Sequence, residues 1–297
     1  EKPLFICIYN YNLENGEYDT KILNNEGKEI FTEYEEVEAI ALKNLITEVP
    51  YEKSVLKYKK DGKYGLIDYT GKVITKPIYE EIDNLLYKEG ELLVKQDGKY
   101  GVINIKGVTL LKPEYDSIAC DGYYNNDTKY GKDGYIVSVK TDEGYRYGYI
   151  DYTGKLLLKM EYNDIYRINN IKESEDIYLV TQRNGQSGLM KNDRQILNNQ
   201  YQSIEFDDQT ELLILEKNKK YGISKLSGTS ILGIDYTSIT IEGIYIYADK
   251  DNQSTIYDLN GNKQSTIKFK DIIDIEKQDV KITVDINGKY GMIDENG

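Results

Sequence analysis

The chain has 297 residues but no His and no Trp, and it has only two Cys. Without His, the sequence excludes Ser-His-Asp and Cys-His catalysis, as well as zinc or haem iron held by His. Cys7 and Cys120 are too few to build a zinc or iron–sulfur site from thiolates alone. We therefore expect no catalytic residue, no metal and no cofactor. The two thiols either form one disulfide or stay unpaired, and both alternatives are open.

Long apolar runs and an excess of positive charge are also missing. No run of 18 apolar residues occurs, so we expect no membrane-spanning segment. The 38 Lys and Arg are outnumbered by 51 Asp and Glu, which gives a net charge of −13. Because an acidic surface repels phosphate groups, binding to nucleic acid is not expected.

Tyrosine is abundant, with 30 residues, and many of these tyrosines belong to a recurring phrase. The phrase reads DGKYGLID at 61–68, DGKYGVIN at 97–104, YRYGYID at 145–151 and NGKYGMID at 287–294. The remaining apolar content is mainly Ile, Leu and Val, and β-branched and aromatic residues favour strands. A phrase repeated every few dozen residues indicates a repeat protein built from β-structure.

Fixed distances extend the repeat beyond this phrase. The anchor positions, which hold the Tyr of the YG pair or its equivalent, are 20, 64, 100, 147, 187, 221, 254 and 290. Seven residues after each anchor comes Gly, except in one unit that has Arg194. An aromatic follows fourteen or fifteen residues after the anchor, and an aliphatic three residues later, at Tyr34/Val37, Tyr79/Ile82, Tyr115/Ile118, Tyr162/Ile165, Tyr201/Ile204, Tyr236/Ile239 and Phe269/Ile272. We therefore predict a single repeat array over 1–297, with about seven complete repeats within 4–278 and a half repeat over 279–297.

Each unit is predicted to hold three or four short antiparallel strands. In the unit after Tyr79, ELLVKQ (91–96) runs into Asp97-Gly98, a favoured hairpin pair, and then into KYGVINI and VTLLKP. A fourth stretch, EYDSIA, is expected to close the unit, and Pro113 to end the third strand. The Gly after each anchor is expected to allow a close backbone approach or a bulge. Residues 37–49 are the one helix candidate, and 120–134 form a predicted surface loop.

The phrase GKYGLIDYTGKVITKPIYEEI resembles the WG repeat found in many bacterial proteins, with Tyr in place of the usual Trp. The residues that carry the resemblance are Tyr64, Gly65, Leu66, Ile67, Asp68, Gly71, Lys72, Pro77, Tyr79 and Ile82. Tyr can fill the same half-buried position while its hydroxyl reaches a polar partner. The resemblance implies a bacterial binding or scaffolding module rather than an enzyme.

The fold class that follows is all-β, a set of tandem antiparallel units in an open superhelical array. A closed seven-bladed ring that resembles a propeller is the alternative. The open array is preferred because FICIYN (5–10) can supply the first strand of the first unit, so that the ends need not share a unit.

The best candidates for ligand binding are the tyrosines that break the repeat pattern, because aromatic faces stack on sugars, prolines and cations. They are Tyr69 and Tyr152 at hairpin tips and Tyr123, Tyr124 and Tyr130 in the inserted loop. The periodic tyrosines are instead expected to belong to the repeat core. Acidic pairs such as Glu35-Glu36, Glu80-Glu81 and Asp207-Asp208 could serve a glycosidase, and Asp249, Asp251, Asp258 and Asn260 are a poor match to a calcium loop.

Three functions are compatible with this sequence. The favoured one is a non-catalytic, monomeric module that binds a protein or a cell-envelope polysaccharide. The others are a carbohydrate-acting hydrolase that uses paired carboxylates, and a structural spacer of a larger cell-surface protein.

Overall fold

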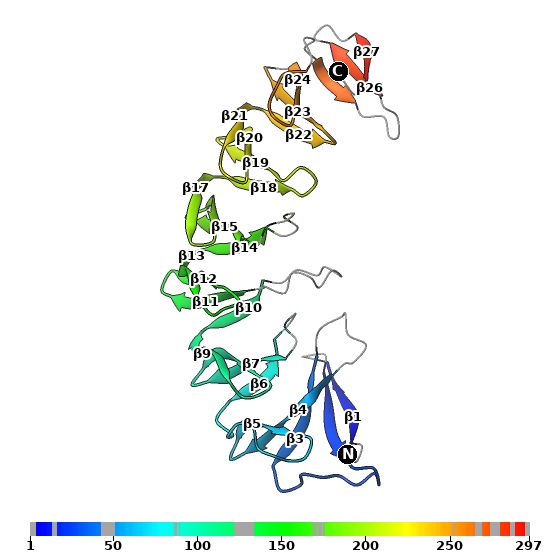
Figure 1. Cartoon of the computed structure of the whole chain (residues 1–297), viewed down its shortest axis with the longest axis vertical. Coiled ribbons are helices and arrows are strands. Elements are labelled where there is room, and N and C mark those ends of the chain that lie inside the picture. Colours follow the sequence, from blue (N-terminus) through cyan, green and yellow to red (C-terminus); the bar gives the residue numbers. More distant parts are fainter. Residues whose placement is uncertain are drawn as a thin grey trace. The chain divides into compact units, whose positions relative to one another are not determined.

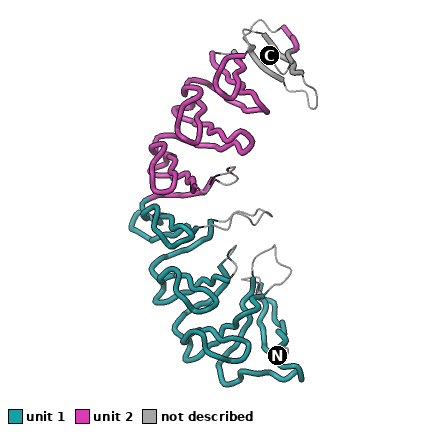
Figure 2. The backbone as a smooth tube through the Cα atoms, viewed as in Figure 1, with its two compact units in different colours: residues 1–161 teal, residues 162–297 magenta. Residues whose placement is uncertain are grey.

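A computed structural model describes the chain except for residues 1–3, 14–16, 43–50, 86–87, 89, 122–133, 169–170, 172–173, 175, 252, 265–268, 274–279, 286–288 and 295–297. The chain divides into two compact units, unit 1 over Glu1–Glu161 and unit 2 over Tyr162–Gly297 (Figure 2). The described residues form strands and turns and contain no helix, which confirms the predicted all-β class. Within that part of the chain, there is accordingly no helix long and apolar enough to cross a membrane.

Unit 1 holds four antiparallel sheets, which we call A to D in chain order (Figure 1). Sheet A consists of β1 (Phe5–Asn12) and β2 (Glu17–Leu23), and sheet B of β3 (Glu36–Ala41), β4 (Tyr51–Lys60) and β5 (Lys63–Asp68). Sheet C consists of β6 (Glu81–Asn84), β7 (Glu91–Gln96), β8 (Lys99–Asn104) and β9 (Thr109–Tyr115). Sheet D consists of β10 (Ser117–Cys120), β11 (Tyr135–Thr141), β12 (Gly144–Ile150) and β13 (Leu156–Tyr162).

Unit 2 continues the pattern with sheets E to G. Sheet E consists of β14 (Asp164–Ile168), β15 (Tyr178–Arg183), β16 (Gln186–Lys191) and β17 (Arg194–Tyr201). Sheet F consists of β18 (Ser203–Asp207), β19 (Leu212–Lys217), β20 (Lys220–Lys225) and β21 (Ser230–Tyr236). Sheet G consists of β22 (Ser238–Glu242), β23 (Tyr245–Lys250), β24 (Gln253–Asp258), β25 (Phe269–Ile273), β26 (Val280–Asp285) and β27 (Tyr290–Asp294). Strands are hydrogen-bonded in chain order throughout, and none of these sheets closes on itself.

The central hairpin of each sheet forms as the sequence predicts. Asp97 and Gly98 have φ angles of 52° and 75°, which is the left-handed geometry of the tight turn that Asp-Gly favours. The turn sets a register in which Lys95 pairs with the anchor Tyr100. The weaker anchors obey the same register, because Gln182 pairs with Ser187 and Asp249 with Ser254. The repeat assignment is therefore correct even where the YG pair is absent.

The Gly after the anchor is required by a close approach of the third strand. A Cβ on Gly101 would lie 2.7 Å from the Leu111 carbonyl oxygen and 2.7 Å from the Pro113 nitrogen, both of which are backbone atoms. The ladder between β8 and β9 shifts register at this point, from Tyr100↔Tyr115 to Val102↔Leu111. The predicted bulge is thus present. Pro113 does not end the strand as expected, but lies inside β9 at the bulge, where a missing N–H is tolerated.

The fourth stretch of the sequence unit does not close that unit. β10, which contains the Ser-Ile-Ala of EYDSIA, pairs with β11 and so begins the next sheet. The same holds for β14, which pairs with β15, and for β18, which pairs with β19. Each four-stranded sheet therefore takes its first strand from the end of the preceding sequence unit. This arrangement connects neighbouring repeats through backbone hydrogen bonds as well as packing.

The helix prediction for residues 37–49 is wrong where the structure describes it. Residues 36–41 form strand β3, in which Val37 pairs with Tyr58 and Ala39 with Leu56. Cross-strand pairing and burial of Ala39 and Ile40 override the apolar spacing that suggested a helix. Residues 43–50, like most of the predicted loop at 120–134, lie outside the described residues.

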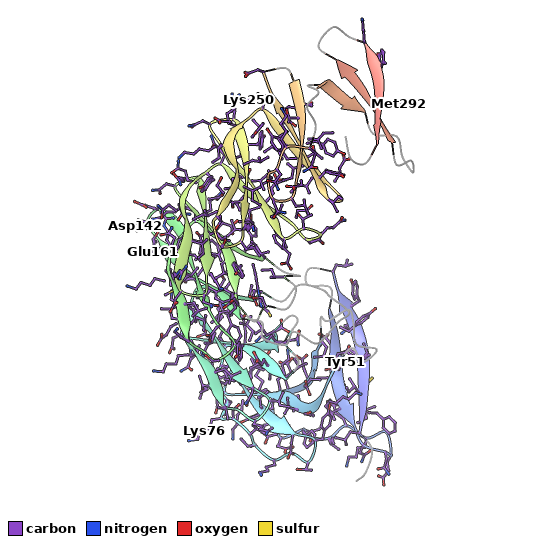
Figure 3. All side chains as sticks on the ribbon, turned by 45° about the horizontal axis from the view of Figure 1, so that its top comes forward. Tyr51, Lys76, Asp142, Glu161, Lys250 and Met292 are labelled. Atoms are coloured by element: carbon purple, nitrogen blue, oxygen red, sulfur yellow. The ribbon has the colours of Figure 1, made fainter. Side chains whose placement is uncertain are left out.

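The hydrophobic core is divided among the spaces between successive sheets. One cluster joins sheets B and C through Val55, Leu66, Tyr79, Ile82 and Val94, with Ile40, Leu92 and Ile103 beside them. Equivalent clusters join A to B, C to D, E to F and F to G. Tyr51, labelled in Figure 3, begins β4 and packs against the cluster between sheets A and B. Each sheet is thus stabilised mainly by its neighbours, as in other repeat proteins.

Candidate interaction surface

The predicted binding tyrosines are placed differently from one another. Tyr69 follows β5, is half-buried against the core between sheets A and B, and donates a hydrogen bond from its hydroxyl to the Glu52 carbonyl oxygen at 2.8 Å. Burial raises the pKa of the Tyr69 hydroxyl, and the nearby Glu52 carboxylate adds to the effect. Tyr152 follows β12 and is 46% exposed. The two belong to sheets B and D, whereas Tyr123, Tyr124 and Tyr130 lie outside the described residues.

Two anchor tyrosines of unit 1, Tyr64 and Tyr100, are held in small polar clusters. The Tyr64 hydroxyl donates to Glu36 at 3.2 Å, and the Lys59 ammonium lies 5.2 Å from the centre of the Tyr64 ring. Burial, together with the Glu36 charge, raises the pKa of Tyr64 to about 12. The next sheet repeats the arrangement, because Lys95 pairs with Glu81 at 2.8 Å and lies 5.2 Å from the Tyr100 ring. These tyrosines are engaged by their own repeats.

A second pair of charges lies beside Tyr64. Lys57 and Glu38 form an ion pair at 3.1 Å, with both side chains largely buried. Burial raises the pKa of Glu38 to about 7, and the neighbouring Glu36 carboxylate on the same strand raises it as well. The Lys57 charge lowers it but does not outweigh these two effects. For Glu36 itself, burial opposes ionisation, but the hydrogen bond from Glu38 and the Lys59 charge outweigh it and lower the pKa. The two carboxyls therefore differ in their readiness to ionise.

The other acidic residues singled out in the sequence hold turns and strands together. The Asp258 carboxylate accepts the backbone N–H groups of Asn260 at 2.9 Å and Asn262 at 2.8 Å, and Asp249 accepts a hydrogen bond from Ser254. Asp207 accepts the N–H and hydroxyl of Thr210. Among the described residues, no three His, Cys, Asp or Glu side chains are grouped so that they could hold a metal ion.

The exposed aromatics gather on sheet A instead. Phe5 is 53% exposed, Tyr9 36%, Tyr11 53% and Tyr18 51%. Phe5, Cys7 and Tyr9 alternate along the outward face of β1, and the Lys21 ammonium from β2 lies 5.1 Å from the centre of the Tyr9 ring. This outward face, defined by Phe5, Cys7, Tyr9 and Lys21, is called the A face below.

Beyond a bulge at Asn10, a second pair of rings extends the aromatic surface. The register of β1 and β2 shifts between Tyr9 and Tyr11, so that Tyr11 pairs with Tyr18. Their ring centres are 4.8 Å apart with planes inclined by 49°. The Asn10 amide donates to the Asp19 carboxylate at 3.2 Å beside them. Rings flanked by polar groups are a combination that can bind sugars as well as peptides.

The A face corresponds to a surface that is covered in the six later repeats whose side chains at this position are described. Phe5 pairs with the residue three positions after the anchor, as do the residues at the same place in later sheets. Those equivalents are at most 2% exposed, namely Leu56, Leu92, Tyr135, Leu179, Leu213 and Ile246. In sheets B and C they pack toward the sheet that precedes them in the chain. The A face thus has the chemistry of a repeat-packing surface but is exposed to solvent.

Neither Phe5, Tyr9, Tyr11 nor Tyr18 was among the predicted binding residues. The sequence analysis predicts FICIYN (5–10) only as the first strand of the first unit. A possible signal is its composition, since FICIYNYN contains no charged residue. Cys7 lies on this face and Cys120 in β10, and they do not form a disulfide with each other.

The sheets and their shared cores define the class of this protein as an all-β tandem repeat protein. The family model of the WG containing repeat matches residues 64–100, 100–127 and 147–170. These three segments are therefore WG repeats, which is consistent with the resemblance of the sequence to that repeat. The matched segments include the anchors Tyr64, Tyr100 and Tyr147.

Comparison with known proteins adds distant likenesses only. No curated protein matches the chain. Among solved structures, a crystal structure of a eukaryotic initiation factor aligns with 100% of this chain and 94% of its own at 10% identity and a TM-score of 0.33. The AfRom2 CNH domain aligns at 10% identity and 0.28, covering 80% of this chain and 90% of that one. Hsv2 of Kluyveromyces lactis aligns at 11% identity and 0.29, covering 70% and 73%. With TM-scores this low, the fold is argued from the sheets themselves.

Proposed function

We propose that this protein is a non-catalytic module that binds another protein through the A face. The observation that carries the proposal is the exposure of Phe5, at 53%, at a position that is buried in every later sheet that the structure describes. Exposed apolar groups of this kind mark interaction surfaces. Because the equivalent positions pack against β-structure, a protein fits this face better than a polysaccharide does.

Site-specific crosslinking tests the proposal. Cys7 lies on the A face and can carry a photo-crosslinker in a Cys120→Ser background. We expect irradiation in an extract of the source cells to yield a defined adduct, identified by mass spectrometry. Phe5→Ser should abolish that adduct, whereas Tyr145→Ala, a change at an exposed tyrosine of β12, should leave it intact. An adduct that survives Phe5→Ser, or the lack of any adduct, would contradict the proposal.

Carbohydrate binding is a second candidate, favoured by the Tyr11–Tyr18 ring pair beside Asn10 and Asp19. It predicts retention on an array of cell-envelope polysaccharides. Alanine at both Tyr11 and Tyr18 should remove that retention, while Phe5→Ser should not. If Phe5→Ser alone removed the retention, the polysaccharide would be bound by the A face and not by the Tyr11–Tyr18 ring pair.

The hydrolase alternative would depend on the Glu36–Glu38 pair, whose pKa values are shifted in opposite directions. Two carboxyls with separated pKa values are typical of glycosidases. Here each also pairs with a lysine, at 3.6 Å from Glu36 to Lys59 and 3.1 Å from Glu38 to Lys57, which favours a structural role. Turnover of chromogenic glycosides that is lost in both Glu36→Gln and Glu38→Gln would support the hydrolase and oppose our proposal.

A further inference from the structure

The first strand of each later sheet occupies the same slot. This strand pairs with the second strand of the sheet. In sheet C, Lys95 of the second strand pairs with the anchor Tyr100, and Ile82 of the first strand pairs with Val94, the residue before Lys95. An Ile or Val takes the place of Ile82 in the other sheets. The pairs are Val37↔Tyr58, Ile82↔Val94, Ile118↔Val137, Ile165↔Thr181, Ile204↔Leu215, Ile239↔Ala248 and Ile272↔Thr283. In sheets C to F this Ile is at most 8% exposed.

A recurring hydrogen-bond set fixes the strand in the slot. The backbone N–H two residues before the Ile donates to the carbonyl oxygen of the residue that pairs with the anchor. The N–H of Glu80 donates to the Lys95 carbonyl at 2.7 Å, and that of Asp116 to the Ser138 carbonyl at 2.8 Å. Its side chain also accepts a backbone N–H from the hairpin, as Glu80 does from Gly98 at 3.1 Å. Asp116, Asn163 and Gln202 make the equivalent side-chain bonds. In sheets C to F the slot thus holds an acceptor side chain followed two residues later by Ile, whereas sheet G has Thr237 at the acceptor position.

Sheet A presents this slot on β1. Ile8 pairs with the anchor Thr20, so Ile8 corresponds to Lys95 and Cys7 to Val94. Sheet A has two strands, and no other described strand is hydrogen-bonded to β1. Val94 is 1% exposed, whereas Cys7 is half-buried and Ile8 is 47% exposed. The edge of β1 therefore lacks, among the described residues, the strand that its counterparts have.

The composition of β1 also suits pairing at an open edge. Its sequence FICIYNYN contains no charged residue and no Pro, in a chain in which 30% of residues are charged. Exposed edge strands usually carry charges or Pro that prevent pairing with another chain. A second copy of this chain offers no spare strand of the required pattern within the described residues, because β3, β6, β10, β14, β18 and β22 are paired in their own sheets.

We propose that the edge of β1 binds an extended strand of a partner protein that carries an acceptor side chain (Asp, Glu, Asn or Gln) two residues before an Ile or Val. The strand pairs antiparallel with β1, and its Ile or Val covers Cys7. This is recognition by addition of a strand to a sheet, in which the backbone supplies affinity and alternate side chains supply specificity. The inference rests on the protein-binding role proposed above and names the chemistry of the partner.

The strand of sheet C provides a probe. A fluorescein-labelled peptide of residues 76–84, KPIYEEIDN, contains the acceptor Glu80 and Ile82 in the required spacing. We expect saturable binding to the full chain by fluorescence anisotropy, with affinity about tenfold or more weaker for the Ile82→Lys peptide, since burial of one Ile is lost. Cys7→Lys in the full chain should reduce binding similarly. Tyr145→Ala, at an exposed tyrosine of β12 in sheet D, should leave binding unchanged.

Thiol alkylation locates the bound peptide. The KPIYEEIDN peptide should slow alkylation of Cys7, measured by mass spectrometry, without slowing that of Cys120. No binding, binding that ignores Ile82→Lys, or binding that leaves Cys7 reactive would overturn the strand proposal. So would a dimer in light scattering in which Cys7 is already protected, because a second copy would then occupy the slot. The crosslinking experiment with Phe5→Ser is an independent test of protein binding through the A face. That proposal can therefore be supported even if the strand-addition proposal is contradicted.

Discussion

The two units use the same joint between repeats but different chemistry. We call joint residue the side chain just before the first strand of each sheet that accepts a backbone N–H from the hairpin tip. In unit 1 it is a carboxylate: Glu80 accepts from Gly98 at 3.1 Å, and Asp116 from Lys140 at 2.7 Å. In sheets E and F of unit 2 it is an amide: Asn163 accepts from Asn184, and Gln202 from Asn218, both at 2.8 Å.

The carboxylates of unit 1 also reach back to the preceding sheet. The Lys63 ammonium of β5 lies 3.1 Å from Glu80, and the Lys99 ammonium of β8 lies 2.7 Å from Asp116. In unit 2, the nearest parallel is Lys217 of β19 in sheet F, which donates to the amide oxygen of Gln200 of β17 in sheet E at 2.7 Å. The shared element is the bond to the backbone, and the ion pair is an addition. A joint therefore requires an acceptor of the right length and reach, whereas its charge is free to vary.

The largest effect is expected from the glycine that follows the anchor, compared at one position in each unit. Gly101→Ala places a Cβ 2.7 Å from two backbone atoms of β9, whereas Gly222→Ala meets the Leu232 carbonyl oxygen and the Ile234 side chain at 2.9 Å and the Gly233 carbonyl carbon at 3.0 Å. Because the contacts of Gly222 are longer and one is to a side chain that can move, we expect Gly101→Ala to destabilise by about 2–3 kcal/mol and Gly222→Ala by less. Urea unfolding with hydrogen exchange localised to β8–β9 and β20–β21 measures both. Gly233→Ala, whose Cβ would meet only the Asp235 carboxylate at 3.9 Å and whose φ is not positive, is the control.

Removal of the joint acceptor should have the next largest effect. Asn163→Ala leaves the Asn184 N–H without its acceptor and should destabilise sheet E by about 1 kcal/mol. In unit 1, Asp116→Ala should speed hydrogen exchange of the β10–β11 pairing more than Asp116→Asn, because Asn can retain the bond to Lys140. Equal effects of Ala and Asn at position 116 would show that the charge, rather than the backbone bond, holds the joint.

The repeat could be predicted from the sequence because each periodic residue has a strict local reason. Gly101 is fixed by the approach of β9, and Asp97-Gly98 by the hairpin turn. The sequence could not predict which sheet each Tyr-acid-polar-Ile stretch joins. The stretch is equally compatible with being the last strand of one sheet or the first strand of the next. Pairing between strands decides this. For the same reason residues 36–41 form β3, paired with β4, and not part of the helix predicted at 37–49. The A face was missed for a related reason, because its exposure depends on what lies beside β1.

The polar clusters of unit 1 predict a pH response centred on sheet B. The pKa of Glu38 is raised to about 7, above the value of about 4.3 expected in the unfolded chain. The folded form therefore retains a proton that the unfolded form loses, so stability falls as the pH rises from about 4.3 through 7. Glu36, Lys57, Lys59 and Tyr64 surround the group. After correction for the intrinsic pH dependence of amide exchange, the protection of β3–β5 should be lower at pH 8 than at pH 5.5, and Glu38→Gln should remove this difference.

The joints should respond to acid in the opposite direction and more weakly, because they are exposed to solvent. The pKa of Asp116 is lowered by the hydrogen bond from Lys99 and by the Lys140 N–H, and that of Glu80 by Lys63 and the Gly98 N–H. Their contribution is present above the unfolded pKa values of about 3.9 and 4.3 and is lost as the pH falls through the lowered folded values. After correction for the intrinsic pH dependence of amide exchange, the protection of the tips of β7–β8 and β11–β12 should therefore decrease once the pH is below about 4. The tips of β15–β16 and β19–β20, held by Asn163 and Gln202, should change less, and an equal loss of protection in both units would show that joint charge has no part in their difference.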